Sequence, residues 1–118
     1  MRLYRFDTGV GESIDLFGSS GFVISKIVRL LEGAVVNCAH LAPQGVIGFH
    51  QTTTDQLFLV VQGEGWVRGA EPARTAIAAG QAAYWIKDEW HESGTGTGMT
   101  AILIEGANFD FSRLIPLK

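Results

Sequence analysis

Glycine-rich turn signals recur at short intervals along the whole chain, and this spacing constrains the fold more than any other feature. Between them lie short runs rich in valine, isoleucine, leucine and aromatic residues, such as "FVISKIV", "AVVNCAHL", "QLFLVVQ" and "MTAILIE". Short strands separated by regular turn signals are typical of an all-β sandwich or barrel. The prolines lie near the ends of these runs, which agrees because proline cannot donate a hydrogen bond within a sheet.

The chain is long enough for one compact domain. It has 118 residues, of which 47% are hydrophobic and 18% charged, so a packed core is expected and disorder is not. No internal repeat, low-complexity tract or linker interrupts it. We therefore predict a single domain over residues 1–118.

One segment is ambiguous. Residues 25–33, "SKIVRLLEG", have apolar residues that also suit the 3.6-residue period of a short helix ending at Gly33. We favour a strand, because β-branched residues dominate the run "FVISKIV" and no N-cap residue is suitably placed.

Two spaced motifs resemble those of the cupin family. In residues 45–63, Gly45 begins the first motif and Gly63 ends it. His50 stands at the first histidine position, Thr52 at the second, and Gln56 at the glutamate position. The resemblance implies a cupin-type jelly-roll barrel, also called a double-stranded β-helix.

The second motif covers residues 80–91. Its spacing is kept from Gly80 to His91, but Ile86 replaces the family's proline and Asp88 replaces its inner glycine. The asparagine sometimes found four residues later is Thr95.

Strand geometry predicts which side chains share a face. Alternate residues of a strand point to the same side, so His50 and Thr52 project together. On the next run Gln56, Phe58 and Val60 share one face, and the intervening apolar residues share the other. Both faces are apolar, which suits a strand between the barrel interior and a second layer or subunit.

The resemblance implies that His91 reaches His50 across the barrel. His50, Gln56 and His91 would then be the ligands of a divalent metal ion, with Zn, Fe, Mn, Ni and Cu not distinguished. Two histidines and one amide leave positions for water or substrate, as in catalytic sites. Thr52 is a poor ligand and would bond a metal-bound water.

The remaining candidates divide into pocket wall and structural residues. Phe58, Tyr84 and Ile86 would shape a mostly apolar pocket for a small organic ligand. His40 is interpreted as a hydrogen-bonded core histidine, and Cys38 as a buried small hydrophobe without an activating partner.

The sequence is compatible with three functions. The first is a metal-dependent enzyme, such as an oxygenase or isomerase. The second is a metal-free or weakly metallated barrel that binds a ligand, for example as a sensor. The third is a structural dimeric barrel whose cavity its own side chains fill. The fold cannot choose between them, and whether the protein is an enzyme is undecided.

Charge and hydropathy set the expected partners. The net charge is −3 and the nine basic residues are scattered, so neither nucleic acid nor an anionic membrane is expected as a partner. A single cysteine and no apolar run of about 18 residues predict a cytoplasmic protein that is not exported. The positive mean hydropathy predicts a homodimer that hides apolar surface.

Overall fold

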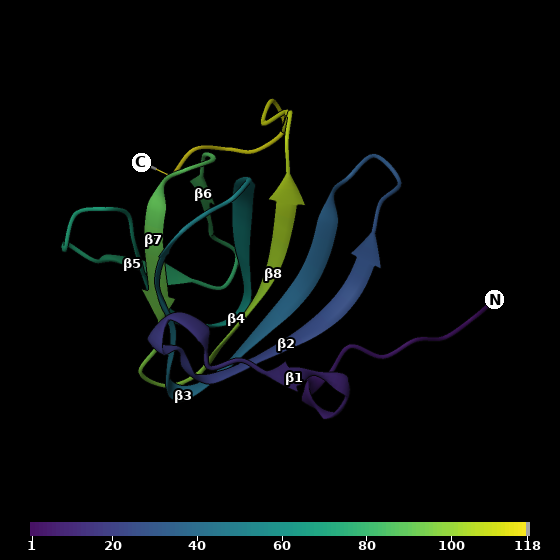
Figure 1. Cartoon of the computed structure of the whole chain (residues 1–118), viewed down its shortest axis with the longest axis horizontal. Coiled ribbons are helices and arrows are strands. Elements are labelled where there is room, and N and C mark those ends of the chain that lie inside the picture. The colour runs from purple at the N-terminus through teal and green to yellow at the C-terminus, as the bar shows by residue number, and fades with distance from the viewer. Residues whose placement is uncertain (118) are drawn as a thin grey trace.

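The computed structural model describes residues 1–117, which form an antiparallel β-barrel (Figure 1). Within this range lie eight strands and two short 3-10 helices. The helices are η1 (Thr8–Val10) and η2 (Leu16–Gly18), and the strands are β1 (Glu12–Ser13), β2 (Ser20–Arg29), β3 (Val35–Gln51), β4 (Asp55–Arg68), β5 (Thr75–Ala78), β6 (Ala82–Trp85), β7 (Trp90–Gly94) and β8 (Met99–Gly106). The predicted all-β class is confirmed.

Two long strands close the barrel because each pairs with different neighbours along its length. In β3, residues 35–41 pair with β8, whereas residues 46–51 pair with β7. In β4, residues 55–63 pair with β8 and residues 66–68 pair with β7. Each long strand therefore pairs with both β7 and β8, which closes the single eight-stranded sheet around one interior.

The bend in β4 depends on glycine at the end of the first motif. Gly63 has a φ of 80°, a left-handed conformation that side chains disfavour. A Cβ there would overlap the carbonyl oxygen of Gly98, which lies at the start of β8. The backbones of two strands approach each other here, so only glycine fits.

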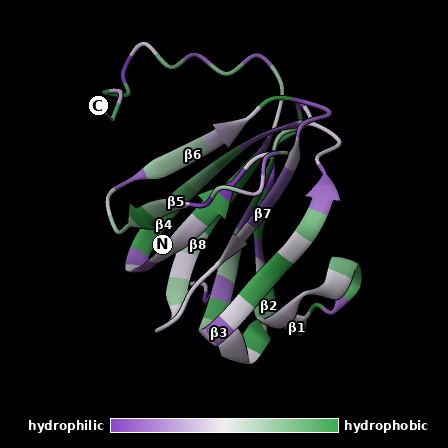
Figure 2. Ribbon diagram, turned by 90° about the vertical axis from the view of Figure 1, so that its left-hand side faces the viewer, coloured by the Kyte–Doolittle hydropathy of each residue, from purple (hydrophilic) through white to green (hydrophobic). Residues whose placement is uncertain are grey.

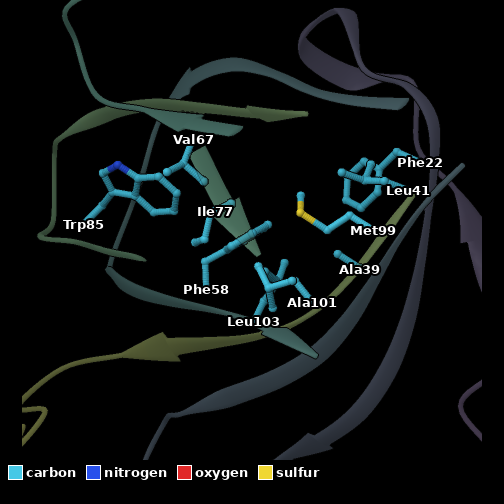
Figure 3. Close-up of a cluster of buried hydrophobic side chains, with 11 residues drawn as sticks. Phe22, Ala39, Leu41, Phe58, Val67, Ile77, Trp85, Met99, Ala101 and Leu103 are labelled. Carbon is cyan, nitrogen blue, oxygen red and sulfur yellow. The ribbon is translucent and has the colours of Figure 1, made fainter. Parts of the chain in front are cut away.

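The core lies inside the barrel, where side chains from opposite strands point toward one another (Figure 3). On β8 the buried residues Met99, Ala101 and Leu103 alternate with partly exposed ones, as the period of two in a strand requires. The buried apolar cluster consists of Phe22, Ala39, Leu41, Phe58, Val60, Val67, Ile77, Trp85, Met99, Ala101 and Leu103.

The strand interpretation of residues 25–33 is confirmed for residues 25–29, which belong to β2. The rest is a turn, closed by a hydrogen bond from the Gly33 amide to the Leu30 carbonyl. Gly33 has a φ of 97°, so it supplies the positive φ of the turn rather than a helix end.

Hydrophobic residues (green in Figure 2) occur on most of the strands, and some of them have exposed side chains. On the outer side of β4, Val61 is 55% exposed. Among residues 1–117, no helix is long and apolar enough to cross a bilayer.

Candidate metal centre and ligand pocket

His50 and His91 are direct partners in the β3–β7 ladder, and this pairing brings their side chains to the same face. Their Nε2 atoms lie 3.1 Å apart, although the residues are 41 positions apart in the sequence. The ring centroids are separated by 4.5 Å. The predicted meeting of the two imidazoles inside the barrel is present in the structure.

Hydrogen bonding fixes which nitrogen of His50 carries the proton. The Nδ1 atom of His50 lies 2.7 Å from the carbonyl oxygen of Gly48, and a carbonyl can only accept. His50 therefore donates from Nδ1, and its Nε2 keeps a lone pair when the ring is neutral. In the His50–His91 contact, Nε2–H of His91 is then the donor. An Nε2 lone pair oriented in this way is what a metal ligand needs.

His91 is held neutral by its surroundings. Only 4% of it is exposed, and the Trp85 ring packs edge-on against it with centroids 4.5 Å apart. Burial, followed by repulsion from a charged His50, lowers the pKa of His91 to about 4. At neutral pH His91 thus offers imidazole, the form that binds cations.

Gln56 reaches the same cavity from β4, where its cross-strand partner on β8 is Glu105. The Nε2 atom of Gln56 donates a hydrogen bond of 2.9 Å to Oε1 of Glu105. Glu105 was not among the residues predicted from the sequence. The sequence contains a pattern that could have identified it, because Glu105 continues the alternation of the inward residues Met99, Ala101 and Leu103.

These polar groups line a cavity of about 220 Å³ that is otherwise mostly apolar. Phe58 forms part of its wall, as predicted, and is 1% exposed. Among residues 1–117, no lysine or arginine belongs to the lining, so this part of the chain offers no cationic side chain to an anionic ligand. The other lining residues are Ile14, Leu16, Phe17, Ser19, Phe22, Ile24, Ile47, Glu92, Ser93 and Leu103.

The η2 helix covers His50. The Phe17 ring stacks on the His50 ring with 4.4 Å between centroids and 9° between planes. Phe17 has a φ of 60°, which is uncommon for a bulky residue. Ser19, directly after η2, holds the segment by accepting a hydrogen bond of 2.9 Å from the Gly48 amide.

Tyr84 and Ile86 do not line this cavity. Tyr84 pairs with Leu57 of β4, so it belongs to the outer face, and its hydroxyl donates to Asp55 at 2.8 Å. Ile86 is 52% exposed. Trp85, which lies between them in the sequence, points inward instead, because successive residues of a strand face opposite sides of the sheet.

Thr52 is buried, but it too lies outside the cavity lining. Its hydroxyl donates to the Thr54 carbonyl at 2.7 Å, and its backbone bonds Asp88 and Glu89. It therefore stabilises a turn, and the expected bond to a metal-bound water has no basis in this arrangement. Asp88, at the family's inner glycine position, keeps the left-handed conformation with a φ of 75°.

Two other residues, His40 and Cys38, lie apart from the histidine pair. His40 is half-buried, and its Nε2 lies 3.0 Å from both Ser25 Oγ and the Phe6 carbonyl. Cys38 is fully buried, and burial raises the pKa of its thiol. Both agree with their structural interpretation.

Glu92 follows His91 directly in the sequence. It forms a half-buried ion pair with Arg68, with 2.8 Å between Arg68 Nε and Glu92 Oε1, and it lines the cavity.

The side chains at this site can bind a divalent cation, but they do not supply a full set of charged ligands. Among residues 1–117, no three His, Cys, Asp or Glu side chains converge on one point. The available donors are the two imidazoles and the amide oxygen of Gln56, and none of them is a carboxylate or a thiolate. Imidazole suits several transition metals, so the set does not select one ion.

The overall structure is similar to those of cupin proteins. A cupin-like protein from Thermotoga maritima matches with a TM-score of 0.75 and 17% identity, over 85% of this chain and 78% of the other. A predicted oxalate decarboxylase from the same organism has a TM-score of 0.74 and 16% identity, over 86% and 96%. A cupin-2 domain protein from Rhodospirillum rubrum has a TM-score of 0.73 and 14% identity, over 92% and 76%.

At the level of sequence, no family model and no curated protein matches the chain. The structural similarities establish the fold, which is the predicted cupin-type jelly-roll barrel.

Proposed function

We propose that this cupin-fold protein binds a small organic molecule in the cavity beside His50 and His91, together with a divalent metal ion. The observation that carries the proposal is the convergence of two imidazoles, with Nε2 atoms 3.1 Å apart, at the wall of a cavity of about 220 Å³. Enclosed apolar cavities with a few convergent polar groups are typical ligand sites.

Three residues would hold the ion: His50 and His91 through Nε2, and Gln56 through its side-chain oxygen. His50 is already oriented by the Gly48 carbonyl. In its present contact with His50, His91 carries the proton on Nε2, so metal binding would require that proton to move to Nδ1. When bound, the ion supplies a Lewis acid for an oxygen of the ligand.

The cavity lining indicates the type of organic ligand. Phe17, Phe22 and Phe58 provide aromatic surface, and Glu105 provides the one carboxylate that is not neutralised by an arginine. A carboxylate ligand would meet no cationic side chain there, and only a bound ion would attract it. The lining therefore favours an apolar molecule with an oxygen group that faces the histidines.

The similarity to known structures supports a small-molecule function. One of the matched proteins, from Thermotoga maritima, is described as a predicted oxalate decarboxylase. The fold itself supports many chemistries, so the support extends to the kind of ligand and not to a reaction.

A metal-free binding barrel is the second candidate, and the His50–His91 contact favours it. One Nε2 donates to the other, so both atoms are satisfied without an ion. The neutral donor set would also hold an ion less tightly than one that contains a carboxylate.

Elemental analysis and thermal melting separate the two candidates. Protein purified without a nickel column and treated with a chelator is melted with and without each divalent ion. An ion at about 100 times its Kd should add roughly 2.7 kcal/mol to the free energy of unfolding. A His91→Ala variant should lose this gain. No copurified metal and no shift with any ion would leave the metal-free candidate.

A further inference from the structure

We propose that Glu105 is a positioning residue that makes Gln56 present its oxygen, rather than its NH2 group, to the cavity. The inference rests on the proposed function, because it explains how a glutamine can serve as a ligand at that site. In this proposal Glu105 acts through Gln56 and is not itself a ligand.

The strand pairing fixes the partners. Gln56 on β4 lies directly opposite Glu105 on β8, and opposite Trp85 on β6 at its other side. Gln56 is 7% exposed, so its contacts within the barrel decide how its amide is oriented. The side-chain carboxylate of Glu105 lies 2.9 Å from its Nε2 atom and can orient the amide by its charge.

The chemistry of the two groups leaves one orientation. An ionised carboxylate only accepts hydrogen bonds, whereas an amide donates from nitrogen and accepts at oxygen. If the Gln56 amide were turned over, its oxygen would face the carboxylate oxygen and no hydrogen bond could form. The nitrogen therefore faces Glu105, and the charge of the carboxylate strengthens the bond.

The oxygen that remains is accessible from the cavity. Among residues 1–117, every side-chain nitrogen or oxygen that is shut off from solvent has a hydrogen-bond partner. The Gln56 oxygen accepts no bond from these residues, so it is not shut off. Because Gln56 lines the cavity, its oxygen is left as an acceptor for an ion or for a donor group of a ligand.

Glu105 also supplies charge to a site whose donors are neutral. None of the ion pairs formed within the described part of the chain includes Glu105. Its negative charge acts on the site through the Gln56 amide, which makes the amide oxygen a better donor toward a cation. Residues that orient metal ligands in this way commonly change metal affinity about 10- to 100-fold when substituted.

The test compares the full chain with three variants. Glu105→Gln removes the charge at nearly the same size, and a Gln in its place can donate or accept, so it no longer fixes the Gln56 amide. The exchange Gln56→Glu with Glu105→Gln keeps a carboxylate–amide hydrogen bond but places the carboxylate at position 56. Glu64→Gln, on the exposed part of β4, is a control with the same change of charge.

Chelator-treated proteins are titrated with Co²⁺, followed by visible absorption. We expect Glu105→Gln to weaken binding about tenfold or more. The exchanged pair should bind at least as tightly as the wild type, and Glu64→Gln should match it. Wild-type affinity in Glu105→Gln would overturn the inference, and so would a loss of binding in the exchanged pair.

A second readout separates this inference from the proposed function. In the metal-free protein, the side-chain NH2 resonances of Gln56 should shift, and should exchange faster with solvent, in Glu105→Gln relative to the wild type. Unchanged resonances would overturn the positioning role. If the wild type binds no Co²⁺ at all, the metal proposal fails, and the NH2 resonances alone decide the role of Glu105.

Discussion

Phe17 and His50 lie face to face, with ring centroids 4.4 Å apart and planes within 9° of parallel. The contact covers one side of the imidazole, although Phe17 itself is 60% exposed. Phe17 adopts a left-handed backbone conformation, which strains the chain locally. The η2 segment is therefore a cap on the histidine pair. Its position depends on Gly48, which lies beneath the Phe17 carbonyl.

We predict that Gly48→Ala displaces this cap. The new Cβ would overlap the Phe17 carbonyl, so the η2 segment must move away from His50. We expect a loss of about 1–3 kcal/mol in the free energy of unfolding, measured by denaturant titration. The ring-proton shifts of His50, which the Phe17 ring influences, should also change. Gly96→Ala is the control because a Cβ there meets no atom within 4 Å. Equal effects of the two variants would contradict the role of Gly48.

The stability of the metal-free protein should fall as the pH drops below about 6.5. The pKa of His91 is about 4 in the folded protein, against 6.5 for an unperturbed histidine. Between these values the unfolded chain binds a proton that the folded protein does not, so acid favours unfolding. The total effect is on the order of 3 kcal/mol.

This contribution belongs to His91, so the difference between wild type and His91→Gln should depend on pH. Denaturant titrations at pH 7.5, 6 and 5 measure it. Stabilities that change in parallel for the two proteins would show that His91 does not have a lowered pKa.

Tyr84→Phe should leave the cavity unaffected. The substitution removes the hydroxyl that donates to Asp55, and we expect a loss of about 1 kcal/mol in stability. Because Tyr84 lies on the outer face, the affinity for divalent ions should equal that of the wild type, measured by the same titration with Co²⁺. A reduced affinity would show that Tyr84 does contribute to the metal site.

The sequence predicted the parts of the structure that depend on local pattern. The alternation on β4 correctly separated Gln56, Phe58 and Val60 from the outward residues, and motif spacing correctly related His50 to His91. Gly63 was recognised from the motif, and the structure supplies the physical reason in the close approach of two strands.

The errors came from the register between distant strands. The face of β6 depends on the pairing of Leu57 with Tyr84, which nothing in the local sequence specifies. Glu105 was missed for the same reason, since its role exists only through pairing with a residue 49 positions away. Thr52 shares a face with His50 in an ideal strand, but β3 ends at Gln51 and the chain turns.

Dimerisation remains a prediction, and the outer face of β4 is where we would test it. Val61 is 55% exposed there, beside an apolar groove of about 530 Å³ lined by β4, β6 and the C-terminal segment. Light scattering coupled to gel filtration should give twice the chain mass, and Val61→Lys should give the monomer. Val28→Lys, on β2, should remain dimeric. A monomeric wild type would contradict the prediction.

The most direct test of the metal centre is a crystal structure of protein purified without nickel and crystallised with Co²⁺, with anomalous scattering to locate the ion. We predict one anomalous peak between the Nε2 atoms of His50 and His91, within bonding distance of the Gln56 side-chain oxygen. A histidine pair that keeps its direct hydrogen bond at saturating Co²⁺, with no peak in the cavity, would contradict the proposed centre.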